Sequence, residues 1–189
     1  MKLLFAALVA PLLLAIGLSA CGGGGGSGDI AVTGDIYDHP KLELYDNEHT
    51  TATQVHLVGN QTADYTVLPP YGEEHSPRPL ACGIYSATPT FEMVVHAMEH
   101  GAVAVWYTPA SLDRDDLETL TEISADHLNG NDYVIQAPYG GLDSAIMLVA
   151  WGVRLPLEEL NVDLIEQFFD EFHDEAPEPL AAGGCSTAR

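Results

Sequence analysis

Two histidines and a glutamate stand close together in the middle of the chain, within His96-Ala97-Met98-Glu99-His100. Residues four apart on a helix lie one above the other, with Cβ atoms about 5–6 Å apart, so His96 and His100 can share one metal ion. The segment also spells the inverted zincin motif, in which a glutamate beside two zinc-binding histidines acts as a general base. Glu99 therefore has three interpretations, in order of preference: it orients a ligand histidine, it acts as a catalytic base on a metal-bound water, or it is a surface acid.

Two further histidines extend the candidate site. His56 lies in a short strand-like segment, and His75 lies in a proline-rich loop that can hold its side chain over a site at little entropic cost. Together with His96 and His100 they predict a metal site of up to four imidazoles. Imidazole suits copper and zinc, and the order of metal affinities favours copper, with zinc next. Four histidine ligands would make a closed structural site, whereas three with an open position would make a catalytic or exchangeable one.

The elements that must position these residues follow from the hydrophobic pattern. Thr90 caps a helix that Gly101 ends, and the apolar run Ala102–Tyr107 after it predicts a buried strand. Farther along, the periods indicate a helix, two strands and a last helix, over residues 113–128, 132–137, 145–153 and 161–172. The order αβαββα in the C-terminal two-thirds predicts an α+β fold: one compact domain in which helices pack on a small mixed β-sheet.

The first twenty residues have the pattern of an export signal. A positive start precedes an apolar run, and Leu18-Ser19-Ala20-Cys21 resembles the bacterial lipobox, whose cysteine is acylated. The alternatives are a plain cleaved signal and an N-terminal anchor. We expect a lipoprotein signal peptide, a Gly-rich tether with an extended lead-in, one globular domain and a loose tail, over residues 1–20, 21–52, 53–178 and 179–189. The protein would then be a lipid-anchored lipoprotein of the cell envelope, on the periplasmic or the extracellular side.

The chain is strongly acidic, with 28 aspartates and glutamates against 6 lysines and arginines and a net charge of −22. Such a charge repels phosphate backbones and argues against nucleic acid as a partner, so attachment to a membrane would depend on the acyl chains at Cys21. The motifs of serine hydrolases, P-loop nucleotide-binding proteins and Cys-x-x-Cys redox proteins are absent, and no G-x-G-x-x-G opens a helix after a strand, as dinucleotide-binding proteins require. No feature of the sequence identifies a partner protein.

Three cysteines are present, and Cys21 belongs to the lipobox-like segment. Cys82 and Cys185 remain, in a compartment that permits disulfides. They either form a disulfide that joins the C-terminal tail to the loop before the His96 helix, or stay as two free thiols.

An ordered series of motifs resembles one known family. The series runs through His56-Leu57, Pro69-Pro70-Tyr71-Gly72-Glu73-Glu74-His75, Val95-His96-Ala97-Met98-Glu99-His100-Gly101 and Ala150-Trp151-Gly152. It is similar to the domain of unknown function 3105 family of exported bacterial and archaeal proteins, and the likeness spans about residues 53–178. The resemblance implies a membrane-anchored or secreted domain that retains the four histidines, and it brings no established activity.

Three functions are compatible with these residues. The preferred hypothesis is a binding module that holds copper or zinc for metal handling or electron transfer; Met93 and Met98 would add soft donors for copper(I) if they were not simply core residues. The second is a metal-dependent enzyme in which Glu99 acts as base. The third is a metal-free structural or interaction domain. Imidazoles dispersed by more than about 8 Å would favour the third, because ligand nitrogens must come within about 2 Å of the ion.

Overall fold

Residues 34–44, 55–59 and 61–179 are described by the structure, a computed structural model. The expected signal peptide, Cys21, Cys185 and residues 180–189 lie outside these ranges, so the predictions made for them stay predictions.

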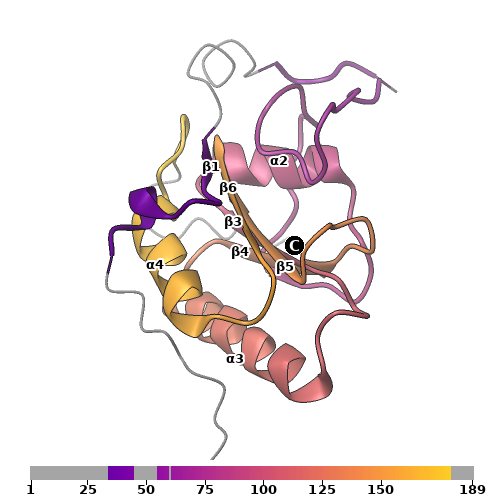
Figure 1. The fold of residues 1–189 in the computed structure, drawn as a ribbon. Helices are drawn as coiled ribbons and strands as arrows, with labels where there is room; N and C mark the ends of the chain where they lie inside the picture. The colour runs from indigo at the N-terminus through magenta and orange to yellow at the C-terminus, as the bar shows by residue number, and fades with distance from the viewer. Residues whose placement is uncertain (1–33, 45–54, 60, 180–189) are drawn as a thin grey trace, which may run out of the picture. The chain divides into compact units, whose positions relative to one another are not determined.

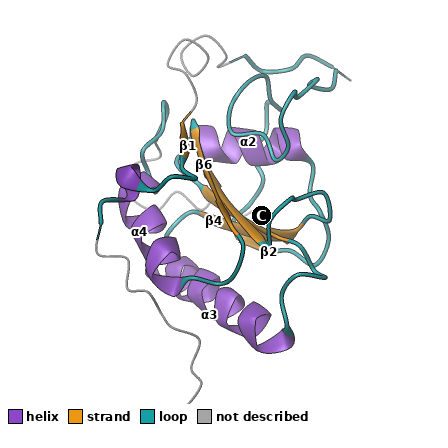
Figure 2. Ribbon diagram, viewed as in Figure 1, coloured by secondary structure: helices purple, strands orange, loops and turns teal. Residues whose placement is uncertain are grey.

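The described residues contain six strands, three α-helices and one 3-10 turn (Figure 2). In chain order they are η1 (Ile36–Asp38), β1 (Glu43–Leu44), β2 (Gly83–Ile84), α2 (Phe91–Glu99), β3 (Val103–Tyr107), α3 (Arg114–Gly130), β4 (Val134–Pro138), β5 (Ile146–Ala150), β6 (Val153–Leu157) and α4 (Val162–Phe172).

The strands form one mixed sheet in the order β1-β6-β5-β3-β4-β2. β4 pairs parallel with both β2 and β3, whereas β3–β5, β5–β6 and β1–β6 pair antiparallel. The parallel pair β3–β4 needs a crossover, and α3 provides it. β3, β4 and β5 are buried along almost their whole length because helices cover both sides of the sheet.

Alternate residues of the central strands enter two separate hydrophobic clusters. Val103 and Val105 of β3 pack in the cluster that contains α3 and α4, whereas Ala104 and Trp106 pack in the cluster that contains α2. This alternation is the period of two that strand geometry requires. Figure 1 shows the result: α2 lies on one side of the sheet, and α3 and α4 lie on the other. The side covered by α2 carries the candidate site.

The predicted fold class is confirmed: the chain has a single α+β domain with a six-stranded mixed sheet and three helices packed against it. The structure adds one strand to the predicted order, because the apolar stretch 145–153 does not run on as one strand. It turns at Trp151 and Gly152, where Gly152 has a φ of +75°, and returns as β6 with Ala150 opposite Val153. Glycine adopts this left-handed conformation without the steric cost that a side chain adds. The turn brings Trp151 to the side of the sheet covered by α2.

Candidate metal centre

The helix α2 has two buried sides, and each has a different role. Val94, Val95 and Met98 pack into the cluster against the sheet, while His96 and Glu99, only 5 % and 1 % exposed, lie on the side away from it. A helix with polar residues this deeply buried must be covered by another segment, because an uncovered side would be solvated. Residues 55–59 and 61–82 provide this cover.

The covering segment is attached to α2 through its backbone. Ser76 N donates to Glu92 O at 3.1 Å, and Leu80 N donates to Met93 O at 2.9 Å. Within the segment, residues 56 and 75 form an isolated parallel bridge, in which Leu57 N donates to the carbonyl oxygen of His75 at 2.7 Å. These backbone bonds place His56 and His75 beside each other over the buried polar side of α2.

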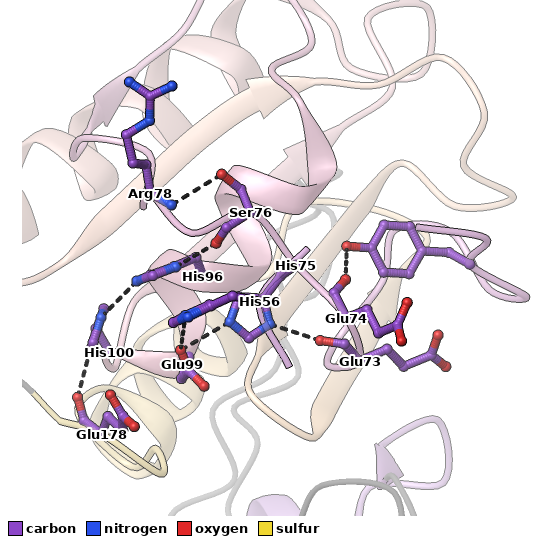
Figure 3. A network of polar contacts seen from close by, with 11 residues as sticks. His56, Glu73, Glu74, His75, Ser76, Arg78, His96, Glu99, His100 and Glu178 are labelled. Atoms are coloured by element: carbon purple, nitrogen blue, oxygen red, sulfur yellow. Dashed lines mark hydrogen bonds and ion pairs between the residues drawn. The ribbon is translucent and has the colours of Figure 1, made fainter. Parts of the chain in front are cut away.

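Three histidines and Glu99 meet at this place, as Figure 3 shows. One ligand atom from each of His56, His75, His96 and Glu99 lies within 4.8 Å of all the others. The rings of His56 and His96 are stacked with centroids 4.9 Å apart, and the His75 ring stands nearly perpendicular to both. Two ligands bound to one zinc ion at about 2.1 Å can be at most about 4.2 Å apart, so small side-chain shifts suffice to close the group around an ion. The four side chains are therefore a group that could hold a metal.

Three imidazoles of the region are fixed in the same way: Nδ1 lies at hydrogen-bonding distance from a backbone carbonyl oxygen. The distances are 2.8 Å from His75 to Glu73, 2.6 Å from His96 to Ser76 and 2.8 Å from His100 to Glu178. A carbonyl oxygen only accepts, so each Nδ1 carries the proton. In the neutral form, which is the form that binds metals, an imidazole has one N–H, so each Nε2 presents its lone pair. This is the arrangement in which proteins hold metal-ligating histidines.

The Nε2 atoms of His75 and His56 both face the carboxylate of Glu99. His75 Nε2 lies 3.0 Å from Oε2 of Glu99, and His56 Nε2 lies 3.7 Å from the same oxygen. In the described part of the chain, imidazoles are the only ion-pair partners of this buried carboxylate. A buried carboxylate needs a positive partner. A cation among the four side chains would satisfy both the lone pairs and the charge.

Burial also favours the uncharged form of one ligand. Desolvation lowers the pKa of His96, and the neighbouring imidazoles of His100 and His75 lower it further, although the Ser76 carbonyl and Glu99 act in the opposite direction. His96 is therefore held in the neutral, metal-binding form.

The structure brings three of the four predicted ligands together, His56, His75 and His96, and it adds Glu99 as the fourth donor. His100 is beside His96 but belongs to a second group, formed with Glu99 and Glu178, whose ligand atoms also lie within 4.8 Å of one another. Sequence reasoning missed Glu178. It lies more than 70 residues after His100, and no sequence signal shows that the chain returns there.

Three residues outside the two metal-ligand groups have bonding partners of their own. Arg154 pairs with Glu43 and lies over the ring of Tyr71, with 5.2 Å from Cζ to the ring centroid. His127, near the end of α3, contacts the carboxylates of Asp132 and Glu166. Separately, Cys82 is disulfide-bonded, and because Cys185 lies outside the described residues, the pairing of these two cysteines stays a prediction.

The last two observations concern the presence of membrane-spanning helices and the similarity of the chain to known proteins. In the described ranges no helix is both long and apolar enough to cross a bilayer. No curated protein and no solved structure matches the sequence. The family described as "Protein of unknown function (DUF3105)" matches residues 56–185, which is more than half of the chain and includes every side chain of both groups. The chain belongs to the DUF3105 family.

Proposed function

We propose that this protein is a lipid-anchored, extracytoplasmic module that holds a divalent transition-metal ion through His56, His75, His96 and Glu99. The observation that carries the proposal is the convergence of the His75 and His56 Nε2 atoms on the buried carboxylate of Glu99. His75 Nε2 lies 3.0 Å from Glu99 Oε2 while its Nδ1 donates to a carbonyl oxygen. With His75 in its neutral form the two atoms are both acceptors and repel each other at this distance, and a bound cation removes the repulsion.

The donor set favours copper(II), with zinc(II) next. Imidazole and carboxylate are borderline and hard ligands, and copper(II) stands at the top of the affinity order for such donors. Copper(I) prefers sulfur, and Met98 is fully buried in the hydrophobic cluster between α2 and the sheet. The donor set thus suits copper(II) and not copper(I). Because electron transfer requires a site that holds both oxidation states, metal handling is the better proposal.

The location is supported by the sequence of the N-terminal region. The lipobox-like Leu18-Ser19-Ala20-Cys21 and the glycine run after it fit a domain held near a membrane by a flexible tether. The strongly acidic composition would attract cations to the protein surface.

The enzyme hypothesis is weaker for a specific reason. Its proposed base, Glu99, contacts the nitrogens of two histidines of the group, so its carboxylate would be occupied as a ligand. One observation is compatible with an exchangeable metal site. The His56 side chain is 48 % exposed, which gives solvent or a small ligand access to one side of the group.

The metal-free hypothesis expected dispersed imidazoles, whereas the ring centroids of His56, His75 and His96 are 4.9–5.2 Å apart.

The test is metal analysis of the full-length protein, purified in detergent without a histidine tag and loaded with copper or zinc. His56→Ala is the most informative variant, because this exposed side chain can be removed without opening the core. We expect its affinity to fall by at least about tenfold. His39→Ala is the matched control, since His39 belongs to neither group. A wild-type protein that stays metal-free after loading, or a His56→Ala variant that binds as tightly as wild type, would exclude the proposal.

A further inference from the structure

The nitrogens of His96 and His100 face each other at a distance that two bare acceptors do not tolerate. Nε2 of His96 lies 2.9 Å from Nε2 of His100. Each imidazole already donates from Nδ1 to a carbonyl oxygen, so neither Nε2 carries a proton in the neutral form. Two lone pairs at this distance repel each other, and a metal ion that takes one of them removes the repulsion.

The surroundings of His100 contain the other donors that a metal ion needs. Glu178 and Glu99 each bring a carboxylate oxygen within 4.8 Å of the His100 ligand atom. Glu99 therefore belongs to both groups, the one with His56, His75 and His96 and the one with His100 and Glu178. A carboxylate has two oxygens and can accept a cation on each.

The second group is held in place by backbone bonds from the segment that follows α4. Asp174 N donates to Gly101 O at 3.0 Å, and Glu178 N donates to Glu99 O at 3.0 Å. The carbonyl oxygen of Glu178 accepts from His100, as described above. The segment is thus bonded to the C-terminal end of α2 through both Asp174 and Glu178. Figure 3 shows Glu178 beside His100.

We propose that the centre holds two divalent transition-metal ions side by side, with Glu99 as a bridging carboxylate. One ion takes His56, His75, His96 and Glu99, and the other takes Glu99, His100 and Glu178. The first ion takes the lone pair of His96 Nε2, which removes the contact between the two bare nitrogens. This inference rests on the proposed function, because the second ion shares a ligand with the first.

The test is a zinc titration of the full-length protein in detergent. Isothermal titration calorimetry and native mass spectrometry measure how many zinc ions each protein molecule binds. Glu178→Gln keeps the backbone atoms that bind His100 and Glu99 and removes only the carboxylate charge. Glu175→Gln is the matched control on the same segment, exposed and outside both groups. We expect two equivalents in wild type and in Glu175→Gln. In Glu178→Gln the second equivalent weakens at least about tenfold, while the first stays within about threefold of wild type.

Copper(II) gives an independent readout by electron paramagnetic resonance. Two ions that share a carboxylate couple magnetically, so wild type loaded with two equivalents shows a reduced signal, and Glu178→Gln shows one isolated ion. A wild type that binds one equivalent overturns the second site and leaves the proposed function standing. If Glu178→Gln binds the second ion as tightly as wild type does, the proposed second site is also overturned, since the second ion then lies elsewhere. Binding of no ion at all overturns both proposals.

Discussion

At the residue scale, the chemistry of the centre depends on which nitrogen of each imidazole carries its proton. Glu99→Gln tests this directly, because the amide has the same shape, carries no charge and has an N–H that can donate to the bare Nε2 of His75. We expect the metal-free variant to be more stable than wild type by about 1 kcal/mol, since a buried charge is removed and a hydrogen bond is gained. Its metal affinity should fall by at least about tenfold. Urea denaturation with chelator present measures the first effect, and competition titration measures the second.

The same substitution at Glu92 is the control for Glu99→Gln. Glu92 lies on the same helix, and its Oε1 accepts from Ala63 N at 3.3 Å, a bond that a glutamine oxygen can also accept. Glu92→Gln should therefore leave metal affinity unchanged. A Glu99→Gln protein that binds metal as tightly as wild type would contradict the assignment of Glu99 as a ligand.

Trp151 offers a second residue-scale prediction. Its ring meets the His75 ring edge to face, with centroids 5.9 Å apart, so a paramagnetic ion bound to His75 lies close to the indole. Copper(II) should quench the tryptophan emission, while zinc(II), which has a filled d shell, should not. Trp151→Phe should lose most of this quenching and keep its copper stoichiometry. Fluorescence titration of wild type and Trp151→Phe with copper(II) measures the quenching. Undiminished quenching in Trp151→Phe would mean that the ion is not bound beside His75.

At the scale of elements, the periodic patterns predicted most of the fold. Apolar residues at helical spacing gave α2, α3 and α4, and the run after Gly101 gave β3. The stretch 145–153 was harder, because a continuous apolar run does not show where a chain turns back. Gly152 is the residue that permits the turn, and its conformation depends on the pairing of β5 with β6.

The candidate site was predictable only as far as residue types and local spacing reach. His56, His75 and His96 belong to a residue type that commonly binds metals, and the motifs around them distinguish them among the eight histidines of the chain. The role of Glu99 as a fourth donor could not be predicted in this way, because it depends on how carbonyl groups distant in sequence orient the imidazole rings. The proton on His75, for example, is fixed by the carbonyl oxygen of Glu73 in a loop with no helical or strand period. Such contacts arise from the tertiary arrangement and leave no periodic trace in sequence.

Gly101 links two elements and carries the element-scale prediction. It joins α2 to β3 with a φ of +99°, and a Cβ there would lie 2.7 Å from Oδ1 and 2.8 Å from Cα of Asp174. Gly101→Ala should cost about 1–3 kcal/mol in the free energy of unfolding through backbone strain. It should also push away the segment that carries Glu178, so the affinity for the second zinc equivalent should fall more than that for the first. Urea denaturation and zinc titration measure the two effects.

Gly59→Ala separates the strain at Gly101 from the clash. Gly59 has a φ of +69°, and nothing lies within 4 Å of the position a Cβ would take. This control should lose about 1–2 kcal/mol in the free energy of unfolding and keep the second zinc equivalent. If the two alanine variants weakened the second equivalent equally, the packing of Asp174 against Gly101 would not be the cause.

At the scale of the whole molecule, the centre joins three parts of the chain that are distant in sequence: the segment with His56 and His75, the helix α2, and the segment with Glu178. A ligand that binds only the folded state stabilises it by mass action. Zinc should therefore raise the thermal midpoint of the protein, and the increase should grow with zinc concentration. Differential scanning fluorimetry at several zinc concentrations measures this, with His39→Ala as a variant that should respond like wild type. A midpoint independent of zinc concentration would show that the ion does not bind the folded state selectively.

Stability of the metal-free protein should depend on pH through His96. Its pKa in the folded state is lowered by burial, whereas the unfolded chain has the ordinary value of about 6.5. Between these two values the unfolded state binds more protons, so the free energy of unfolding rises with pH in that window. The contribution of His96 is therefore fully present above about pH 6.5 and is lost as the pH falls towards the lowered folded-state pKa.

Two measurements on chelator-treated protein check this dependence. The urea midpoint should be lower at pH 5.5 than at pH 7.5, and the difference should shrink in His96→Gln, which cannot titrate. NMR titration of the His96 ring proton should place its pKa below 6.5, because desolvation outweighs the favourable contacts with Ser76 and Glu99. A His96 pKa above 6.5 would mean instead that the proton shared with His100 outweighs burial. In that event the metal-free centre would be held together by an imidazolium–imidazole pair, and acid would strengthen it.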